Sequence, residues 1–400
     1  MKLPPLVPAL EQGSNIKRAL RRHLKSLGFT RDPTGQLVLV DGSKDGFRNC
    51  HAAQRAQKLK ENWEFIQRTW AQHRFHFASG EEIAPEAISP RLEMVNAGTW
   101  QSELFRLATL TWSVPVSSGY GRRMRFLVWD KQNSKLIGLI GLTDPVFNLR
   151  ARDADIGWNG ETRRSMLACM MDAHILGALP PYNRLLGGKL VSCLIKSRFV
   201  RDAFRKKYAS AVGVISGEAK DARLVAVTTS SSLGRSSIYN RLKLGGEPYF
   251  SRVGFTEGYG HFQVPQDLFE KMRHYLTSIG HPYAGGNEFG NGPNWRLRAI
   301  RACLEDLKID SKILQHNLKR EVFVCPLAQN YREYLRQEHR RPQWGGLTSV
   351  TEIAQLAKDR WIIPRSQRCD DWRAWESSEA LSLIEGVFES KERLKNGSRL

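Results

Sequence analysis

Over the first part of the chain, apolar and polar residues alternate with the period of an α-helix. A first apolar stripe predicts a helix that ends at Gly28. The members of this stripe are Ile16, Leu20, Leu24 and Leu27. A second stripe predicts another helix over residues 47–76. We therefore expect a basic helical N-terminal domain over residues 1–85 and a proline-containing linker at 81–90.

Beyond the linker, short runs with a period of two alternate with helical segments. Strands are predicted at residues 125–129, 136–142, 153–158, 223–229 and 249–256. Helices are predicted at residues 161–179, 184–208 and 236–244. Strands that alternate with helices favour an α/β (α+β) domain with a mixed sheet over residues 91–265. Helical periodicity at 265–279 and after Asn294 predicts a mainly helical, basic C-terminal region over residues 266–400.

The balance of charge suggests what the protein binds. The chain of 400 residues carries 61 Lys and Arg against 40 Asp and Glu, which gives a net charge of +21. Such an excess favours anionic partners, and nucleic acid is the commonest of these. A generally basic protein without a nucleic-acid partner is the alternative.

The cysteines and the apolar runs indicate the setting of the protein. None of the six cysteines forms a CxxC pair, which argues against a zinc ribbon or a redox motif. They are interpreted as reduced thiols of an intracellular protein. No apolar run reaches the roughly 18 residues that a membrane span needs. We expect a cytoplasmic protein without a membrane partner.

Cations that cluster on three predicted helices are the candidate contacts to nucleic acid. Those expected to contact phosphates are Lys17, Arg18, Arg21, Arg22, Lys25, Arg198, Arg201, Arg205, Lys206, Arg296 and Arg298. Arg198, Arg201 and Arg205 fall on one helical face. The last two cations follow a glycine-rich loop at 280–293, a geometry that suits a phosphate. A solvated helix face is the alternative interpretation.

A glycine pair opens the predicted helix at 184–208. The candidate phosphate or cofactor loop consists of Arg184, Gly187, Gly188 and Lys189. Glycine lets a backbone approach an anion, and the start of a helix offers free N–H groups. Close helix packing is the alternative reason for the two glycines.

This loop resembles the pyrophosphate loop of the GNAT acetyltransferases, whose pattern is Gln/Arg-x-x-Gly-x-Gly/Ala. A later stretch, SSIYNRL followed by a Gly-Phe strand, resembles the later part of the same fold. The resemblance implies a GNAT-like fold for the central domain. Two departures argue against a working acetyl-CoA site, because Lys189 stands in the third loop position and no predicted strand directly precedes Arg184. We therefore predict no cofactor.

A nuclease is a further alternative. The tripeptide Glu218-Ala-Lys220 resembles half of the pattern of restriction-type nucleases, in which a carboxylate holds Mg²⁺ beside a lysine. Asp144 or Asp155 would supply the second acid. The chain has no Walker A ending, no GxSxG elbow and no HExxH motif, so nucleoside-triphosphate hydrolysis and these hydrolase classes are not expected.

Several segments together resemble one family. They lie at residues 136–158, 183–194, 236–260, 290–301 and 316–330. In this order and spacing they are similar to the DruA family of the bacterial Druantia anti-phage defence system. The resemblance implies a role in defence beside a large helicase-like protein, and it transfers no catalytic residue. We expect a defence component that binds DNA, with a degenerate acyltransferase, a magnesium-dependent nuclease or a non-catalytic scaffold as alternatives.

Overall fold

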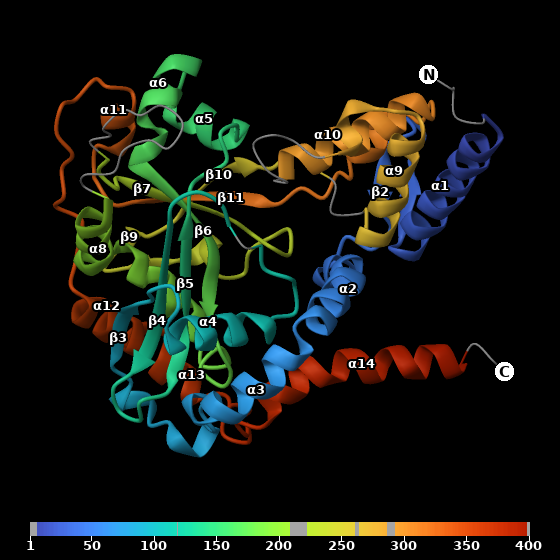
Figure 1. Ribbon diagram of the computed structural model, residues 1–400. Coiled ribbons are helices and arrows are strands. Elements are labelled where there is room, and N and C mark those ends of the chain that lie inside the picture. Colours follow the sequence, from blue (N-terminus) through green and yellow to red (C-terminus); the bar gives the residue numbers. More distant parts are fainter. Residues whose placement is uncertain (1–5, 118, 209–221, 261–263, 286–292, 398–400) are drawn as a thin grey trace. The chain divides into compact units, whose positions relative to one another are not determined.

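The computed structural model describes residues 6–117, 119–208, 222–260, 264–285 and 293–397 (Figure 1). The chain forms two compact units. The smaller unit combines Met1–Gln54 with Thr256–Arg320, and the larger combines Arg55–Phe255 with Glu321–Leu400. This division differs from the predicted boundaries after residues 85 and 265. The reason is that the smaller unit is completed by a segment inserted between two strands of the larger unit, which local periodicity cannot reveal.

A sheet of seven described strands lies at the centre of the larger unit. In chain order they are β3 (Pro90–Met94), β4 (Arg123–Asp130), β5 (Leu136–Thr143), β6 (Met170–Ala178), β7 (Ala226–Ser230), β10 (Ser251–Phe255) and β11 (Glu321–Pro326). Across the sheet their order is β10-β11-β7-β6-β5-β4-β3. Neighbours are antiparallel except β6 and β7, whose parallel pairing runs from Met170 opposite Ala226 to Asp172 opposite Thr228. The predicted α/β class with a mixed sheet is confirmed.

Helices cover both faces of this sheet, because successive side chains of a strand point to opposite faces. On one face, Phe126 of β4 belongs to a core that includes α7 (Gly187–Cys193) and α12 (Val350–Ala357). On the other face, Leu127 packs in a core with α4 (Trp100–Leu110). Figure 1 shows α4 in front of β4 and β5, which it contacts. Strand β5 is therefore buried along its whole length.

At two places the local pattern predicted the wrong element. Strand β6 occupies the second half of the segment 161–179 that was predicted to be helix, and only the first half is helical, in α6 (Gly160–Met166) and the 3-10 turn Leu167–Cys169. Pairing of β6 with β5 and β7 outweighs its local helix preference. Conversely, the strand predicted at 153–158 lies largely in α5 (Arg150–Ile156), whose two buried residues are four positions apart.

The predicted helix at 184–208 is interrupted. Helix α7 is followed by a 3-10 turn and then by α8 (Arg198–Tyr208). The break falls at Ser197, whose backbone pairs with that of Thr348. The remaining helices and strands of the larger unit are α3 (Trp63–His73), α11 (Tyr331–Leu335), α13 (Ile363–Ser366), α14 (Glu379–Gly397), β8 (Lys243–Leu244) and β9 (Glu247–Pro248).

The smaller unit is built around α1 (Leu6–Ser26), which packs against α9 (Gln266–Ser278). Its predicted apolar stripe is confirmed, because all four members are buried. Helix α10 (Pro293–Asp306) also packs on α9. The other elements are the hairpin of β1 (Phe29–Arg31) and β2 (Leu37–Leu39), and α2 (Lys44–Glu61), which continues into the larger unit. None of the described helices is long and apolar enough to cross a membrane.

The close approach of β5 and β6 at Gly138 gives a test of the sheet. A Cβ atom at Gly138 would lie 2.3 Å from the Gly177 carbonyl oxygen and 2.9 Å from the Ala178 Cα, so backbone atoms would have to move. We expect Gly138→Ala to lower the free energy of unfolding by about 1–3 kcal/mol, the usual range for overpacking. Urea unfolding measures this. Gly160→Ala is the control, since no atom lies within 4 Å of the added Cβ, and equal stability of the two variants would contradict the pairing.

Candidate nucleic-acid interface

One face of α1 carries a row of exposed cations. Arg18, Arg21, Arg22 and Lys25 are exposed, and Lys17 is half-buried. The four exposed residues recur at positions i, i+3, i+4 and i+7, so they form one stripe opposite the buried apolar residues. In the described part of the chain, no carboxylate forms an ion pair with any of the four. We call these four residues the α1 stripe, and it is a row of exposed cations without an ion pair to a described carboxylate.

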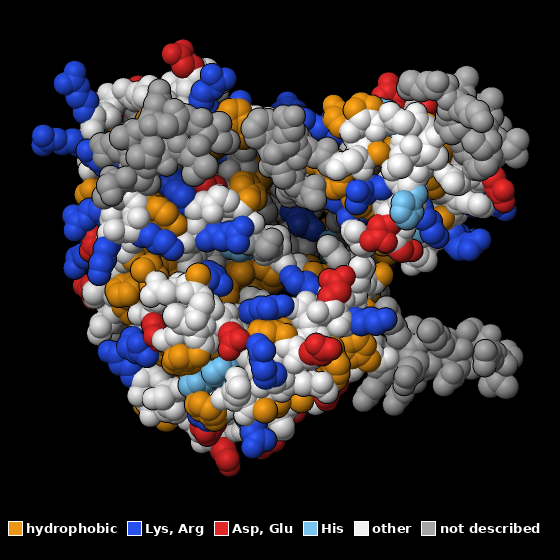
Figure 2. All heavy atoms as spheres, viewed as in Figure 1, with side chains coloured by type: hydrophobic (Ala, Val, Ile, Leu, Met, Phe, Trp, Pro, Cys, Tyr) orange, Lys and Arg blue, Asp and Glu red, His pale blue; other side chains and the backbone are white. Residues whose placement is uncertain are grey.

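A second group of cations lies on α8. Arg198, Arg205 and Lys206 are exposed there, in a part of the larger unit where Figure 2 shows Lys and Arg side chains gathered. Arg201 is half-buried and differs from them. Its guanidinium lies 2.7 Å from the Asp202 carboxylate and 5.3 Å from the Trp344 ring. Because these contacts already occupy it, Arg201 is the least available of the four predicted contacts.

An exposed cation beside α8, Arg123, was not among the predicted contacts. Lys207 Nζ and Tyr208 Oη each donate a hydrogen bond of 2.8 Å to the Arg123 carbonyl oxygen. They hold the first residue of β4 against the end of the helix, where the Arg123 side chain is exposed. The cluster Arg122, Arg123 and Arg125 was a visible signal, but it lies at the start of a predicted strand and not on a basic helix.

The two arginines of α10 that were predicted as contacts differ in their surroundings. Arg296 is half-buried, donates a hydrogen bond of 2.7 Å to the Val264 carbonyl oxygen, and lies 4.2 Å from the Phe269 ring. Burial lowers the pKa of Arg296. Arg298 is exposed. Half of the glycine-rich loop before the helix, residues 286–292, lies outside the described residues.

The glycine pair lies in a packed environment. Gly187 and Gly188 are buried, and the Gly187 N–H donates a hydrogen bond of 2.8 Å to the Tyr182 carbonyl oxygen. A Cβ atom at Gly187 would lie 2.6 Å from that same oxygen. These contacts favour the packing interpretation of the glycines. The second half of the segment before the loop, predicted to be helix, is strand β6, which ends at Ala178 and does not directly precede Arg184.

The charged residues of the same loop contact the C-terminal part of the chain. The Arg184 guanidinium lies 4.9 Å from the Trp375 ring, and the Lys189 ammonium lies 5.2 Å from the Trp361 ring. Burial, followed by the charge of Arg360, lowers the pKa of Lys189. Phosphate binding at this loop stays a prediction.

The acids considered for a nuclease are bound by arginines at separate places. Asp144 accepts a hydrogen bond of 2.7 Å from Arg122 Nε, and Asp155 accepts one of 2.7 Å from Arg332. Glu218 and Lys220 lie outside the described residues. Among the residues that are described, no group of three or more His, Cys, Asp or Glu could hold a metal ion.

An acidic residue that the sequence analysis missed lies on β6. Asp172 accepts a hydrogen bond of 2.7 Å from Thr228 Oγ1, and burial raises the pKa of Asp172 to about 6. Burial also lowers the pKa of His174, on the same strand, to about 4. The alternating pattern of MMDAHIL is typical of a strand and was the available signal, but this segment was predicted to be helix.

The chain is similar to known proteins over most of its length. A family model described as "Druantia protein DruA" matches residues 41–337. A curated protein named Druantia protein DruA, from Escherichia coli (strain UMEA 4076-1), is 50% identical over 371 residues, which cover 93% of this chain and 92% of that protein. No solved structure matches.

The raised pKa of Asp172 predicts a stability that depends on pH. A carboxyl group whose pKa is raised by folding stabilises the fold while it is protonated, and this contribution is lost as pH rises from 3.8 through about 6. We expect Asp172→Asn to be more stable than the wild type at pH 8, because asparagine stays neutral and can still accept from Thr228. Urea unfolding at several pH values should show this advantage shrinking as pH falls from 6 to 4. An advantage that does not vary with pH would contradict the assignment.

Proposed function

The chain belongs to the DruA family of the Druantia anti-phage defence system, and we propose that it is a component that binds DNA. The α1 stripe carries this proposal. Burial of the apolar side of α1 keeps four cations at the surface, and no described carboxylate neutralises them. Such a row gains free energy on a polyanion, because each phosphate contact releases a condensed counterion.

A group of exposed cations in the larger unit is proposed as a second contact surface. They lie on α8 and at the start of β4 and comprise Arg198, Arg205, Lys206 and Arg123. Arg205 is 76% exposed and lies 3.9 Å from the nearest carboxylate oxygen, that of Asp202. An exposed ion pair at that distance is weak, so a phosphate can replace it at little cost. Arg298 would add a contact on the smaller unit. We propose that the chain presents DNA to a helicase-like component of the same system.

A degenerate GNAT-type acyltransferase is a second candidate, and the sheet topology favours it. When only the strands of the seven-stranded sheet are counted along the chain, β6 is the fourth and β7 is the fifth. These two strands are the parallel pair, and the glycine pair follows β6. This is where the resemblance to the GNAT pyrophosphate loop would put it. Binding of acetyl-CoA to the wild type that is lost in Gly188→Glu would support this candidate.

Two other candidates have direct tests. Mg²⁺-dependent cleavage of DNA that is abolished in Glu218→Gln would support a nuclease. A stable complex with other defence components, without affinity for DNA, would support a scaffold whose basic faces bind acidic partners.

The first test of DNA binding is its dependence on salt. We expect the affinity for a short duplex to fall with a log–log slope of about −0.9 per phosphate contact. Arg21→Glu combined with Arg22→Glu should weaken binding at low salt and make the slope shallower by about 2, because two contacts are removed. Fluorescence anisotropy across a salt series measures both quantities.

The matched control changes the same net charge in the same unit, away from the α1 stripe. Lys44→Glu combined with Lys312→Glu serves this purpose, since both lysines are exposed on other elements. We expect this control to keep most of the wild-type affinity and slope. Equal losses in the two double variants would contradict the assignment to α1, and a wild type that binds no DNA at low salt would overturn the proposed function.

A further inference from the structure

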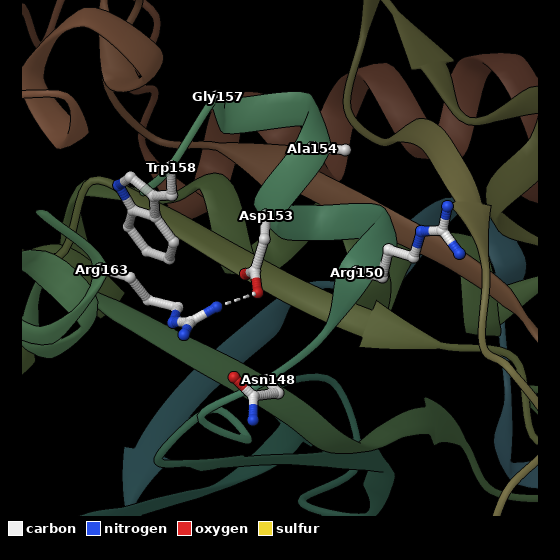
Figure 3. A pocket seen from close by; sticks show the side chains of 7 residues that line it. All are labelled: Asn148, Arg150, Asp153, Ala154, Gly157, Trp158 and Arg163. Atoms are coloured by element: carbon white, nitrogen blue, oxygen red, sulfur yellow. Dashed lines mark hydrogen bonds and ion pairs between the residues drawn. The ribbon is translucent and has the colours of Figure 1, made fainter. Parts of the chain in front are cut away.

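A pocket of about 350 Å³ opens beside α5 in the larger unit (Figure 3). Its walls come from the loop before α5, from α5 itself, from the turn after it and from α6. Figure 3 shows Trp158 and Arg163 on the same side of Asp153, whereas Arg150 extends to the other side. The pocket therefore combines an aromatic ring with an arginine over a fixed carboxylate.

Asp153 organises the base of the pocket. Its carboxylate accepts hydrogen bonds from Arg152 Nε at 2.8 Å, from Arg163 at 3.0 Å and from the Leu149 N–H at 3.2 Å. Arg152 is fully buried, so its charge and that of Asp153 offset each other within the fold. The Arg163 guanidinium adds a second cation beside this single carboxylate, so the pocket has an excess of positive charge that favours an anionic ligand.

Arg163 retains a donor for such a ligand. One of its terminal nitrogens is bonded to Asp153, and its guanidinium lies 4.6 Å from the Phe147 ring. Its other terminal nitrogen makes no hydrogen bond with the described residues, and the side chain is 21% exposed. This nitrogen can therefore donate to a ligand oxygen in the pocket.

Trp158 gives the pocket a rigid stacking surface. Its indole N–H donates a hydrogen bond of 2.8 Å to the Leu335 carbonyl oxygen, which fixes the ring. The ring is half-buried, and the Arg152 guanidinium lies 5.4 Å from it. Beside the pocket, Val146 and Phe147 are 45% and 46% exposed, so the apolar surface continues outward. Fixed aromatic rings beside arginines are the usual platforms for unpaired bases.

We propose that this pocket binds one unpaired nucleotide of a DNA strand, with the base on Trp158 and the phosphate at Arg163. The exposed amide of Asn148 is within the lining and can bond the edge of the base or a phosphate oxygen. The inference rests on the proposed DNA-binding function and adds a preference for unpaired or terminal nucleotides. Neither the α1 stripe nor the cations of α8 would give this preference, because phosphate contacts alone do not read bases.

The experiment compares three duplexes by fluorescence anisotropy at one low salt concentration. The first is blunt, the second carries a one-nucleotide overhang, and the third carries the same overhang without its base. We expect the overhang to bind about tenfold tighter than the blunt duplex, and the abasic overhang to lose most of this gain, as a single stacked base would give. Adenosine monophosphate is titrated separately, to distinguish a strand from a free nucleotide.

Variants assign the preference to the pocket. The preference for the overhang should fall in each of three variants, Trp158→Leu, Arg163→Gln and Asn148→Ala. Their affinity for the blunt duplex should stay nearly unchanged. Arg164→Gln is the control, because Arg164 lies on the same helix, is exposed and does not line the pocket. Trp158→Phe should keep the preference. Asn148 is exposed, so its variant keeps the test valid if a change at Trp158 prevents folding.

The outcomes separate this inference from the function on which it rests. Equal affinity for all three duplexes, with the variants unchanged, would overturn the pocket assignment and leave DNA binding through the α1 stripe intact. Adenosine monophosphate that binds as tightly as the overhanging duplex would overturn the assignment to a strand. A wild type that binds none of the duplexes would overturn both proposals.

Discussion

Burial of one apolar side fixes the position of the cations on each basic helix. Moving an unpaired ammonium or guanidinium into the interior costs several kcal/mol or more, so a helix that buries aliphatic residues must turn its cations outward. On α1 the buried side includes Ile16, Leu20 and Leu24, and on α8 it comprises Val200 and Phe204. The positive surfaces of both units follow from this constraint, and among the described residues no carboxylate forms an ion pair with the α1 stripe.

The same constraint explains why some arginines are unavailable. Those that lie inside the fold are bound by carboxylates, carbonyl oxygens or aromatic rings. Arg152 is held by Asp153, Arg296 by the Val264 carbonyl oxygen, and Arg184 lies over Trp375. A high net charge therefore does not translate directly into a binding surface. A binding surface is formed by the cations that stay exposed and are not held by other groups of the fold, and the α1 stripe is the clearest such set.

Elements whose burial is local in sequence could be predicted, and elements that depend on distant partners could not. The apolar side of α1 and the strands β4 and β5 are determined by residues that are close in sequence, so periodicity identified them. Strand β6 exists because β5 and β7 flank it, and the smaller unit is closed by residues 256–320. The predicted contact residues divide in the same way, into those set by local sequence and those set by distant partners. Exposure of Arg21 follows from the pattern of its own helix, whereas the half-buried position of Arg296 depends on the distant Phe269.

Arginine footprinting is the most direct test of DNA contact at the α1 stripe, since it reports on named side chains in the unmodified protein. The chain would be treated with an arginine-specific reagent with and without duplex DNA, and each modified peptide quantified by mass spectrometry. The account predicts that DNA protects Arg18, Arg21 and Arg22, while Arg48, which is ion-paired with Asp45 at 2.6 Å, is modified equally in both states. DNA that binds without protecting these three arginines would contradict it.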